Sequence, residues 1–344
     1  MLYVGMDVSS KSFVVHVINE KKKVVFRDEV SPSREGLRQL MTRLGAEKKL
    51  TVFEAGNQMK WIALTLKKME GVEIHVVHPN EVKWISQSNG KTDKVDAKKL
   101  AELARADMLP RAVHIVEGKV RELRELTSAR THLMGKRIAL VNTIYGYAKQ
   151  EGHRLPGRFF SREDWKEALS KSKFTKTLQT IIESFMESIA AMQKSQAALN
   201  EKIVAIEDER LERLESIPSI GALTSRTLLG ALDNAERFDD KKAAAKYGAL
   251  VPTLYQSGNV TQLGHVNRNG RHEVRRVLLQ CAHTLARMKS AGAAPLRAFY
   301  ERIRRKRGKK IAIVALARKL LTIAYGVLKH GTYYDPAKLM PARA

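Results

Sequence analysis

Four carboxylates in the first hundred residues have the types and spacing of a metal site. Asp7 interrupts an otherwise apolar stretch, and Glu54 ends a second one. Asp93 and Asp96 are three residues apart at an expected helix start, so both project from one helical face. Clustered carboxylates need cations to stay ionised, and Mg²⁺ prefers oxygen ligands. Two such ions about 4 Å apart would hold the attacking and leaving oxygens of a phosphodiester.

Each of these carboxylates also has a simpler explanation. Asp93 and Asp96 could complement a helix dipole, and Glu54 could be a lone surface acid. Asp7 is the hardest to explain in this way, because a buried, unpaired carboxylate in a strand costs several kcal/mol. The metal site is therefore a hypothesis about how the surrounding elements bring the four together.

A second candidate for chemistry is Ser257, which precedes Gly258 in a small-residue turn that could expose its hydroxyl. A serine becomes a useful nucleophile only when a base, a metal or nearby positive charge activates it. Guanidiniums in the next twenty residues could hold a phosphate and its developing charge, namely Arg268, Arg271, Arg275 and Arg276. Because Ser-Gly pairs are also common in ordinary turns, the residues alone leave this role open.

The charge of the chain points to a polyanionic partner. There are 62 Lys and Arg against 36 Asp and Glu, a net charge of +26, and residues 216–344 hold 24 basic and 7 acidic residues, a net +17. Each phosphate contact releases condensed counterions, so such an excess favours nucleic-acid binding. Charge alone is best explained by a structural nucleic-acid-binding protein. The densest basic run is expected to contact phosphates through Arg304, Arg305, Lys306, Arg307, Lys309 and Lys310.

The elements that must position the carboxylates alternate between strand and helix patterns. A hairpin opens the chain, and strands and helices then follow each other, which predicts an α/β domain whose strand ends meet one helix face. The expected strands are 2–8, 12–19, 23–30, 51–54 and 73–77, and the expected helices are 34–45, 58–69 and 93–107.

The middle of the chain predicts a long helix. Residues 158–217 contain no Gly and no Pro, and a strict 4-3 spacing from Leu178 to Arg210 is apolar at eight of ten positions. This spacing is typical of a coiled-coil seam. The seam could also pack within its own chain, but its narrowness and polar flanks favour pairing between chains.

Pro218 ends this helical stretch and begins a turn. Residues 217–223 lead into another helical run, the pattern of a helix-hairpin-helix whose amides near Gly221 would point at a phosphate. A plain helix-turn-helix corner fits the spacing equally well. Further helices are expected at 272–289 and 311–329. The apolar run 311–328 contains Arg318 and Lys319, so it predicts a packed helix and no membrane span.

Cysteine usage and the first residues bear on the compartment. Cys281 is the only cysteine, which excludes a disulfide framework and a cysteine zinc site. The opening residues lack the basic segment and long apolar core of a signal peptide. We therefore expect a reducing, cytosolic compartment.

Several stretches resemble the DEDD insertion-sequence transposases, the family numbered one hundred and ten, which includes the pilin-gene invertases. In the first half these are Asp7, Glu54 within Phe-Glu-Ala-Gly, and residues 91–97. In the second half they are residues 217–221, 247–252, 256–258 and 269–271. The resemblance covers most of the chain in the expected order. One departure is Ser219, where a glycine is usual.

The resemblance implies three domains. Residues 1–110 would form a ribonuclease-H-like, RuvC-type α/β domain in which Asp7, Glu54, Asp93 and Asp96 are catalytic Mg²⁺ ligands, with Mn²⁺ able to substitute. Residues 111–215 would form a helical coiled-coil oligomerisation region. Residues 216–344 would form a basic, mostly α-helical transposase domain with a helix-hairpin-helix and the catalytic Ser257.

The same resemblance implies the reaction and the partners. The protein would be an RNA-guided DNA transposase or recombinase that cleaves and rejoins DNA through a phosphoserine intermediate. Its partners would be donor and target DNA, a noncoding bridge RNA, and further copies of itself as a dimer, or a tetramer on DNA, in the nucleoid of a bacterial or archaeal cell. The alternatives are a metal-dependent Holliday-junction-type nuclease, a protein-only site-specific invertase and a structural nucleic-acid-binding protein. A sugar-kinase-like ATPase is disfavoured because the sequence lacks a glycine-rich phosphate loop.

Overall fold

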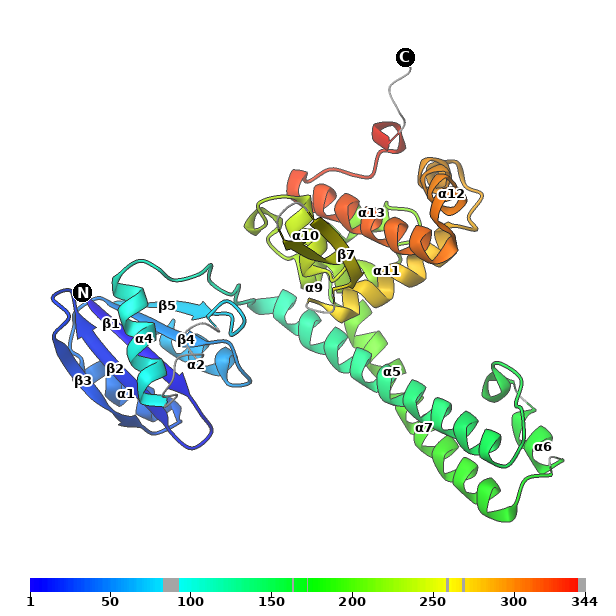
Figure 1. Cartoon of the computed structure of the whole chain (residues 1–344), viewed down its shortest axis with the longest axis horizontal. Helices are drawn as coiled ribbons and strands as arrows, with labels where there is room; N and C mark the ends of the chain where they lie inside the picture. Colours follow the sequence, from blue (N-terminus) through cyan, green and yellow to red (C-terminus); the bar gives the residue numbers. More distant parts are fainter. Residues whose placement is uncertain (83–92, 163, 172, 258–259, 268–269, 340–344) are drawn as a thin grey trace. The chain divides into compact units, whose positions relative to one another are not determined.

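The chain folds into two compact units, Met1–Ile115 and Val116–Ala344 (Figure 1). The computed structural model describes residues 1–82, 93–162, 164–171, 173–257, 260–267 and 270–339. The first unit combines strands and helices, and the second is mostly helical, so the expected succession of an α/β part and a helical part is confirmed. The three-domain division with boundaries at residues 110 and 215 stays a prediction.

The first unit is built on a five-stranded mixed sheet. Its strands are β1 (Leu2–Val8), β2 (Phe13–Asn19), β3 (Val24–Val30), β4 (Lys49–Glu54) and β5 (Val72–Val77). They lie in the order β3-β2-β1-β4-β5. The pairs β1–β2 and β2–β3 are antiparallel, whereas β1–β4 and β4–β5 are parallel. All five strands were predicted from the sequence, because each is a short run rich in apolar residues between turn signals.

Helices line the two faces of this sheet. They are α1 (Arg34–Arg43), α2 (Met59–Leu66) and α4 (Asp93–Arg105). Side chains alternate along β1, so that Val4 and Met6 pack in one core with α1 and α2, while Tyr3 packs in another with α4. Burying each such Val or Met side chain stabilises the unit by about 1.5–3 kcal/mol. This alternation decides on which side of the sheet each polar residue of β1 lies.

The second unit is a helical assembly with one small β-ribbon. Its longer helices are α5 (Gly118–Gln150), α7 (Lys176–Val204), α9 (Ala222–Leu232), α11 (His272–Leu285), α12 (Ala294–Arg307) and α13 (Lys309–His330). Shorter helices are α6 (Trp165–Ser170), α8 (Arg210–Glu215) and α10 (Lys241–Tyr247). The ribbon pairs β6 (Pro252–Ser257) with β7 (Val260–Val266) in antiparallel register.

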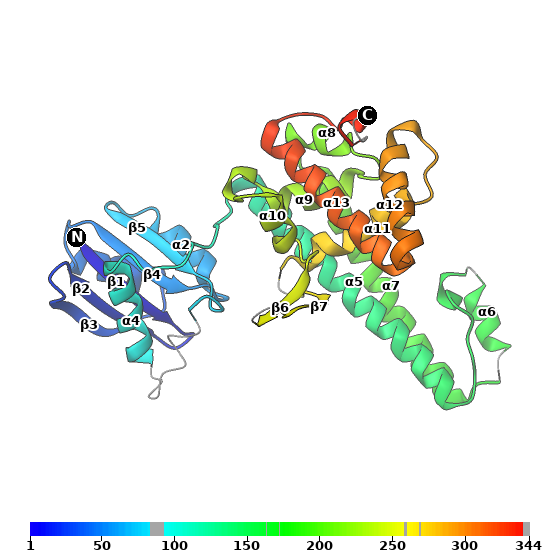
Figure 2. The same ribbon diagram turned by 45° about the horizontal axis from the view of Figure 1, so that its top comes forward.

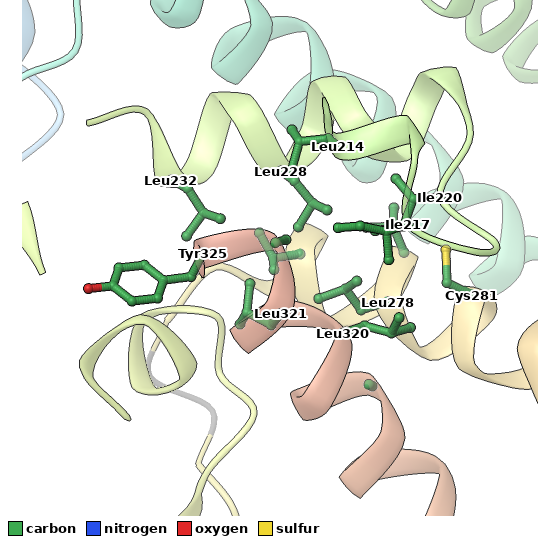
Figure 3. Packing of buried hydrophobic residues seen from close by; sticks show 14 of the residues in the cluster. Leu214, Ile217, Ile220, Leu228, Leu232, Leu278, Cys281, Leu320, Leu321 and Tyr325 are labelled. Atoms are coloured by element: carbon green, nitrogen blue, oxygen red, sulfur yellow. The ribbon is translucent and has the colours of Figure 1, made fainter. Parts of the chain in front are cut away.

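One apolar core holds most of these helices together (Figure 3). Leu228 from α9, Leu278 from α11, and Leu320 and Leu321 from α13 are fully buried and point toward one another. α13 is long and apolar enough to cross a membrane by length and composition alone. Half of its most apolar window is nevertheless buried inside the protein, against α10, α11 and α12. The packed helix expected for the run 311–328 is therefore what the structure contains.

The seam expected to pair between chains packs within the chain instead. α7 lies along α5, and the ten seam positions are all buried or half-buried in this one chain. The expectation of one helix through the seam to Arg210 is wrong, because α7 ends at Val204 and α8 begins at Arg210. Apolar residues that recur every 3.5 positions form a narrow stripe on a helix, but this spacing does not show whether the partner helix belongs to the same chain or to another. Here the 33-residue helix α5 fills that role.

A buried seam within one chain makes a stability prediction. Ile189 is 3 % exposed on α7, and replacing it by alanine leaves a cavity against α5. We expect Ile189→Ala to lower the free energy of unfolding by about 2–5 kcal/mol, measured by urea denaturation. The matched control is Ile138→Ala on α5, where Ile138 is 45 % exposed and the loss should stay below about 0.5 kcal/mol. Pairing between chains would be indicated if the two substitutions lowered the free energy of unfolding equally. It would also be indicated if Ile189→Ala reduced the mass of the protein in solution and left its stability unchanged.

Candidate active site and nucleic-acid interface

Asp7 and Glu54 occupy equivalent positions on neighbouring parallel strands. Met6 of β1 is in register with Phe53 of β4, so the next residue on each strand is a carboxylate at its carboxyl end. Both side chains are half-buried. On β4, Val52 packs in the α4-side core, and the period of two puts Glu54 on that same face. By the same alternation Asp7 shares the face of Tyr3, so both carboxylates lie on the α4 side of the sheet.

The direction of α4 brings its first turn toward these strand ends. Tyr3 packs with the core that contains Leu103, near the end of α4, whereas Gly5 contacts the backbone of Ala97 in its second turn. Residues nearer the carboxyl end of β1 therefore lie opposite residues nearer the amino end of α4. Two residues beyond Gly5, Asp7 is accordingly expected opposite the first turn of α4, which begins at Asp93.

Asp93 and Asp96 lie on the sheet-facing side of α4 by helical spacing. They stand four residues before Ala97 and Leu100, which are 0 % and 1 % exposed. Only the backbone of Asp93 is described. Asp96 is half-buried, and its Oδ1 atom is buried and accepts no hydrogen bond from any described residue. A buried carboxylate oxygen without a donor is costly unless a cation approaches it.

The donor set suits a hard divalent cation, but the described side chains do not by themselves form its coordination shell. Three carboxylates, Asp7, Glu54 and Asp96, come to one edge of the sheet, and the buried Oδ1 of Asp96, which has no donor among the described residues, would suit a divalent cation. Within the described part of the chain, no group of three or more His, Cys, Asp or Glu is close enough to hold a metal ion. The side chain of Asp93 stands outside that comparison, so the four-carboxylate site stays a proposal.

A test of how α4 positions these carboxylates lies in Gly5. A Cβ atom there would come within 2.0 Å of the Ala97 carbonyl oxygen and 2.6 Å of the Ala101 nitrogen, both backbone atoms that cannot swing aside. We expect Gly5→Ala to push α4 off the sheet and to destabilise the protein by about 1–3 kcal/mol or more, measured by denaturant unfolding. Gly56→Ala is the control, because a Cβ there meets nothing within 4 Å. Equal stability of the two variants would contradict the close packing of α4 on β1.

Ser257 lies at the end of a strand and beside the tip of the β6–β7 ribbon. It is the last residue of β6 and is in register with Val260, the first residue of β7. The ribbon stands at the edge of the helical core (Figure 2). Its base is fixed by two backbone hydrogen bonds, from Asn267 to Val251 and from Arg271 to Tyr247, each 2.8 Å long. Ser257 thus ends a strand of a β-ribbon, which the mostly helical expectation for this region had not included. The other residue of the expected turn, Gly258, lies outside the described residues.

The arginines that follow Ser257 differ in their surroundings. Arg268 lies outside the described residues. Arg271 forms an ion pair with Glu273 at 2.7 Å, so its charge is already matched within the protein. Arg275 is half-buried beside His272. Arg276 is half-buried, and its Nη1 atom is buried without an acceptor among the described residues.

The basic run after residue 301 is helical and exposed. Arg304–Arg307 form the last turn of α12, and Lys309 and Lys310 begin α13. The break between them is at Gly308, whose φ of +80° is a left-handed conformation that favours glycine. Four cations at the carboxyl end of α12 also complement its helix dipole. The basic run is therefore helical on both sides of Gly308, and its contact with phosphates stays a prediction.

A cavity of about 800 Å³ lies next to this basic run. Arg304 and Lys309 line it together with Arg158 and Arg287, which sequence patterns had not singled out. The two added arginines come from the α5–α7 connection and from the end of α11, so only the fold brings them to the run. Single arginines that are far apart in the sequence give no indication that they will line the same cavity.

The predicted helix-hairpin-helix corresponds to α8, a short turn and α9. Ile217 and Ile220 are buried in the turn, and Gly221 is exposed at the N-cap of α9. Ser219 has a φ of +73°, a left-handed conformation that glycine adopts at a lower energetic cost than serine. This explains why a glycine is expected at this position. The turn is built although the residue is serine, while its contact with phosphate stays a prediction.

Two family models match the chain, one in each half. Residues 4–150 match the model of a DEDD transposase domain, and residues 211–301 match the model described as "Transposase IS116/IS110/IS902 family". The chain is 26 % identical over 340 residues to the transposase for insertion sequence element IS1111A of Coxiella burnetii, covering 96 % of this chain and 90 % of that protein. It is 22 % identical over 350 residues to the transposase for element IS1328 of Yersinia enterocolitica, covering 96 % and 98 %.

A pilin gene-inverting protein of Moraxella bovis is 33 % identical over 131 residues, 37 % of this chain and 39 % of that protein. The family models and the relatives that match most of the chain identify the protein as a DNA transposase or recombinase. The chain belongs to the IS110 family of transposases.

Proposed function

We propose that this protein is an RNA-guided DNA recombinase in which the carboxylates of the first unit and Ser257 of the second both act on DNA. The observation that carries the carboxylate half is the pair Asp7 and Glu54, which directly follow the registered residues Met6 and Phe53 on parallel strands. The helix that covers them adds Asp96, whose buried Oδ1 has no hydrogen-bond partner among the described residues. The sheet order β3-β2-β1-β4-β5 supports a ribonuclease-H-like fold of the RuvC type for this unit. The DEDD domain match supports a divalent metal, and hard oxygen ligands favour Mg²⁺ or Mn²⁺.

The proposed chemistry conserves the phosphodiester bond energy. Ser257 Oγ attacks a DNA phosphorus, so that an Oγ–P bond forms, the bond to a strand oxygen breaks, and the serine proton leaves with the strand as its new hydroxyl. The hydroxyl of the exchanged strand then attacks the phosphoserine and restores the serine. Bound divalent ions would stabilise the charge that develops on the phosphate. The arginines after β7 hold that phosphate in place.

The RNA-guided part rests on the basic second half and on the family resemblance, and the basic run beside the 800 Å³ cavity offers a surface for it. The test is a strand-exchange assay with the DNA that flanks the gene on both sides, after sequencing of the RNA that copurifies. We expect a defined RNA from this flanking DNA and recombinant junctions only when it is present. Recombination by an RNA-free protein would leave a protein-only invertase, which the similarity to the pilin gene-inverting protein favours as the second candidate.

A shared assembly can be tested with the same assay. Protein inactivated at Asp7 is mixed with protein inactivated at Ser257 (both by substitution with alanine). Regained strand exchange would support self-association in which one protomer supplies carboxylates and another supplies the serine. No regained activity from separately folded proteins would confine both functions to one protomer.

A further inference from the structure

Three arginines lie on α5 and α11, two helices that pack together. Arg130 and Arg137 lie on α5, seven residues or two turns apart, and Arg276 lies in the second turn of α11. All three are half-buried. Within the described ranges of the chain, none of them has an acidic partner within ion-pair distance. We call these three residues the arginine cluster.

Some half-buried arginines of this unit are matched by carboxylates. Arg210 pairs with Asp208 at 2.8 Å, Arg226 pairs with Glu207 and Glu215, and Arg271 pairs with Glu273. Arginine in a partly desolvated position is ordinarily matched in this way, because an unpaired charge there is costly. Arg124 also has no ion pair among the described residues, but it donates to the backbone carbonyls of Gly230 and Ala231. In the arginine cluster, the charges of Arg137 and Arg276 instead lie close enough to act on Arg130.

Arg130 is held in place by neutral groups. Its Nε atom donates a hydrogen bond of 2.6 Å to Oδ1 of Asn200 on α7. Burial and then the positive charges of Arg137 and Arg276 lower the pKa of Arg130, so the nearest strong charges repel it. Arg276 adds a guanidinium nitrogen that is buried and has no acceptor in the described part of the protein. Converging guanidiniums with unused donors are matched to a phosphate, which accepts such hydrogen bonds in pairs.

The position of the cluster connects it with Ser257. α11 begins at His272, six residues after β7 ends, so Arg276 belongs to the same ribbon-and-helix segment as Ser257. Arg130 and Arg137 are about 10 Å apart along the axis of α5, enough to span more than one phosphate of a strand. Neither of them stands out in the sequence, because α5 carries charged residues along its whole length.

We propose that Arg130, Arg137 and Arg276 bind the phosphodiester backbone of the DNA on which Ser257 acts. This proposal rests on the proposed function, since it takes the β6–β7 ribbon as the site of attack. DNA is favoured over RNA because the family acts on DNA and because Arg276 follows directly from that ribbon. The three are positioning residues that hold the strand, and the reaction itself takes place at the serine.

The first test measures stability without nucleic acid. Arg137 and Arg276 both repel Arg130, so Arg276→Gln and Arg137→Gln should each raise the melting temperature of the nucleic-acid-free protein by about 2–4 °C. Lys136→Gln removes the same charge from an exposed position on α5 and should leave the melting temperature unchanged. A lower melting temperature for both cluster variants would show that the arginines serve the fold, and it would overturn the proposal.

The second test measures binding in protein that also carries Ser257→Ala, so that no strand exchange takes place. The probes are a labelled duplex of the flanking DNA and an RNA of the same sequence. We expect each cluster variant to bind the duplex about tenfold more weakly, with a salt slope smaller by about one charge, and Arg276→Lys to retain most of the affinity. Unchanged duplex binding, or a loss confined to the RNA, would refute the assignment to DNA. A missing serine–DNA adduct would instead refute the proposed function and leave this binding result standing.

Discussion

Replacing Ser257 by alanine is expected to abolish strand exchange, by at least about a thousandfold, while the protein still folds and binds DNA. The change removes the attacking oxygen but almost no volume, and it lies at the end of β6 at the edge of the second unit's core. A hydrolytic nuclease attacks with water and has no use for this hydroxyl. A recombinase must keep the bond energy while strands change partners, and a phosphoserine linkage does so without an external energy source.

The decisive measurement is the linkage itself. A reaction of the wild-type protein is stopped by denaturation, DNA attached to protein is isolated, and the modified peptide is mapped to residue 257. Thr261→Ala, on the paired strand of the same ribbon, is the matched control and should still form the adduct. Cleavage and joining without any adduct, or recombination by Ser257→Ala, would replace the two-site mechanism by direct transesterification at the carboxylates.

The second large effect is expected at the carboxylates. Asp7→Asn, Glu54→Gln and Asp96→Asn should each reduce strand exchange by about a thousandfold or more, and excess chelator should do the same to the wild type. Each substitution keeps the shape of the side chain and removes one anionic ligand. DNA binding should remain, because the basic residues of the second unit are untouched.

Metal binding can be measured apart from catalysis. Mg²⁺ or Mn²⁺ should raise the melting temperature of the wild-type protein and should have little effect on Asp7→Asn, since a ligand that binds only the folded state stabilises it. Glu102→Gln removes an acid from the exposed side of α4 and should keep the response. Full activity in excess chelator, or an equal metal response in Asp7→Asn, would rule out the four-carboxylate site.

Local patterns were informative wherever the physical cause is local. The strands and helices of the first unit follow from short apolar runs, helical spacing and turn residues, and their ends agree with the structure within a few residues. The unusual position of Asp7 could also be predicted from the sequence, because the apolar run that it interrupts is a local pattern. The glycine expected at position 219 came from the family resemblance, and the φ of +73° at Ser219 supplies the physical cause.

The heptad seam shows where local patterns stop. The spacing identified the apolar stripe on α7, but the helix that packs against this stripe is α5 of the same chain. α5 begins more than fifty residues before α7 begins. An apolar stripe can pack against any partner of complementary shape, whether it belongs to the same chain or to another. The reason is that the hydrophobic effect depends only on the apolar area removed from water. The choice between the two partners is made by the connection through α6, which returns the chain along α5.

What the sequence by itself determined is the chemistry available to this protein: the candidate carboxylates Asp7, Glu54, Asp93 and Asp96, a serine before a glycine, and a surplus of cations in the last third. Only the tertiary structure decided which of these meet. The parallel pairing of β1 with β4 puts Asp7 beside Glu54, and the packing of α11 on α5 gathers Arg130, Arg137 and Arg276. The reason is physical: residue type sets charge and reactivity locally, whereas proximity between distant segments arises from register and packing across the whole unit.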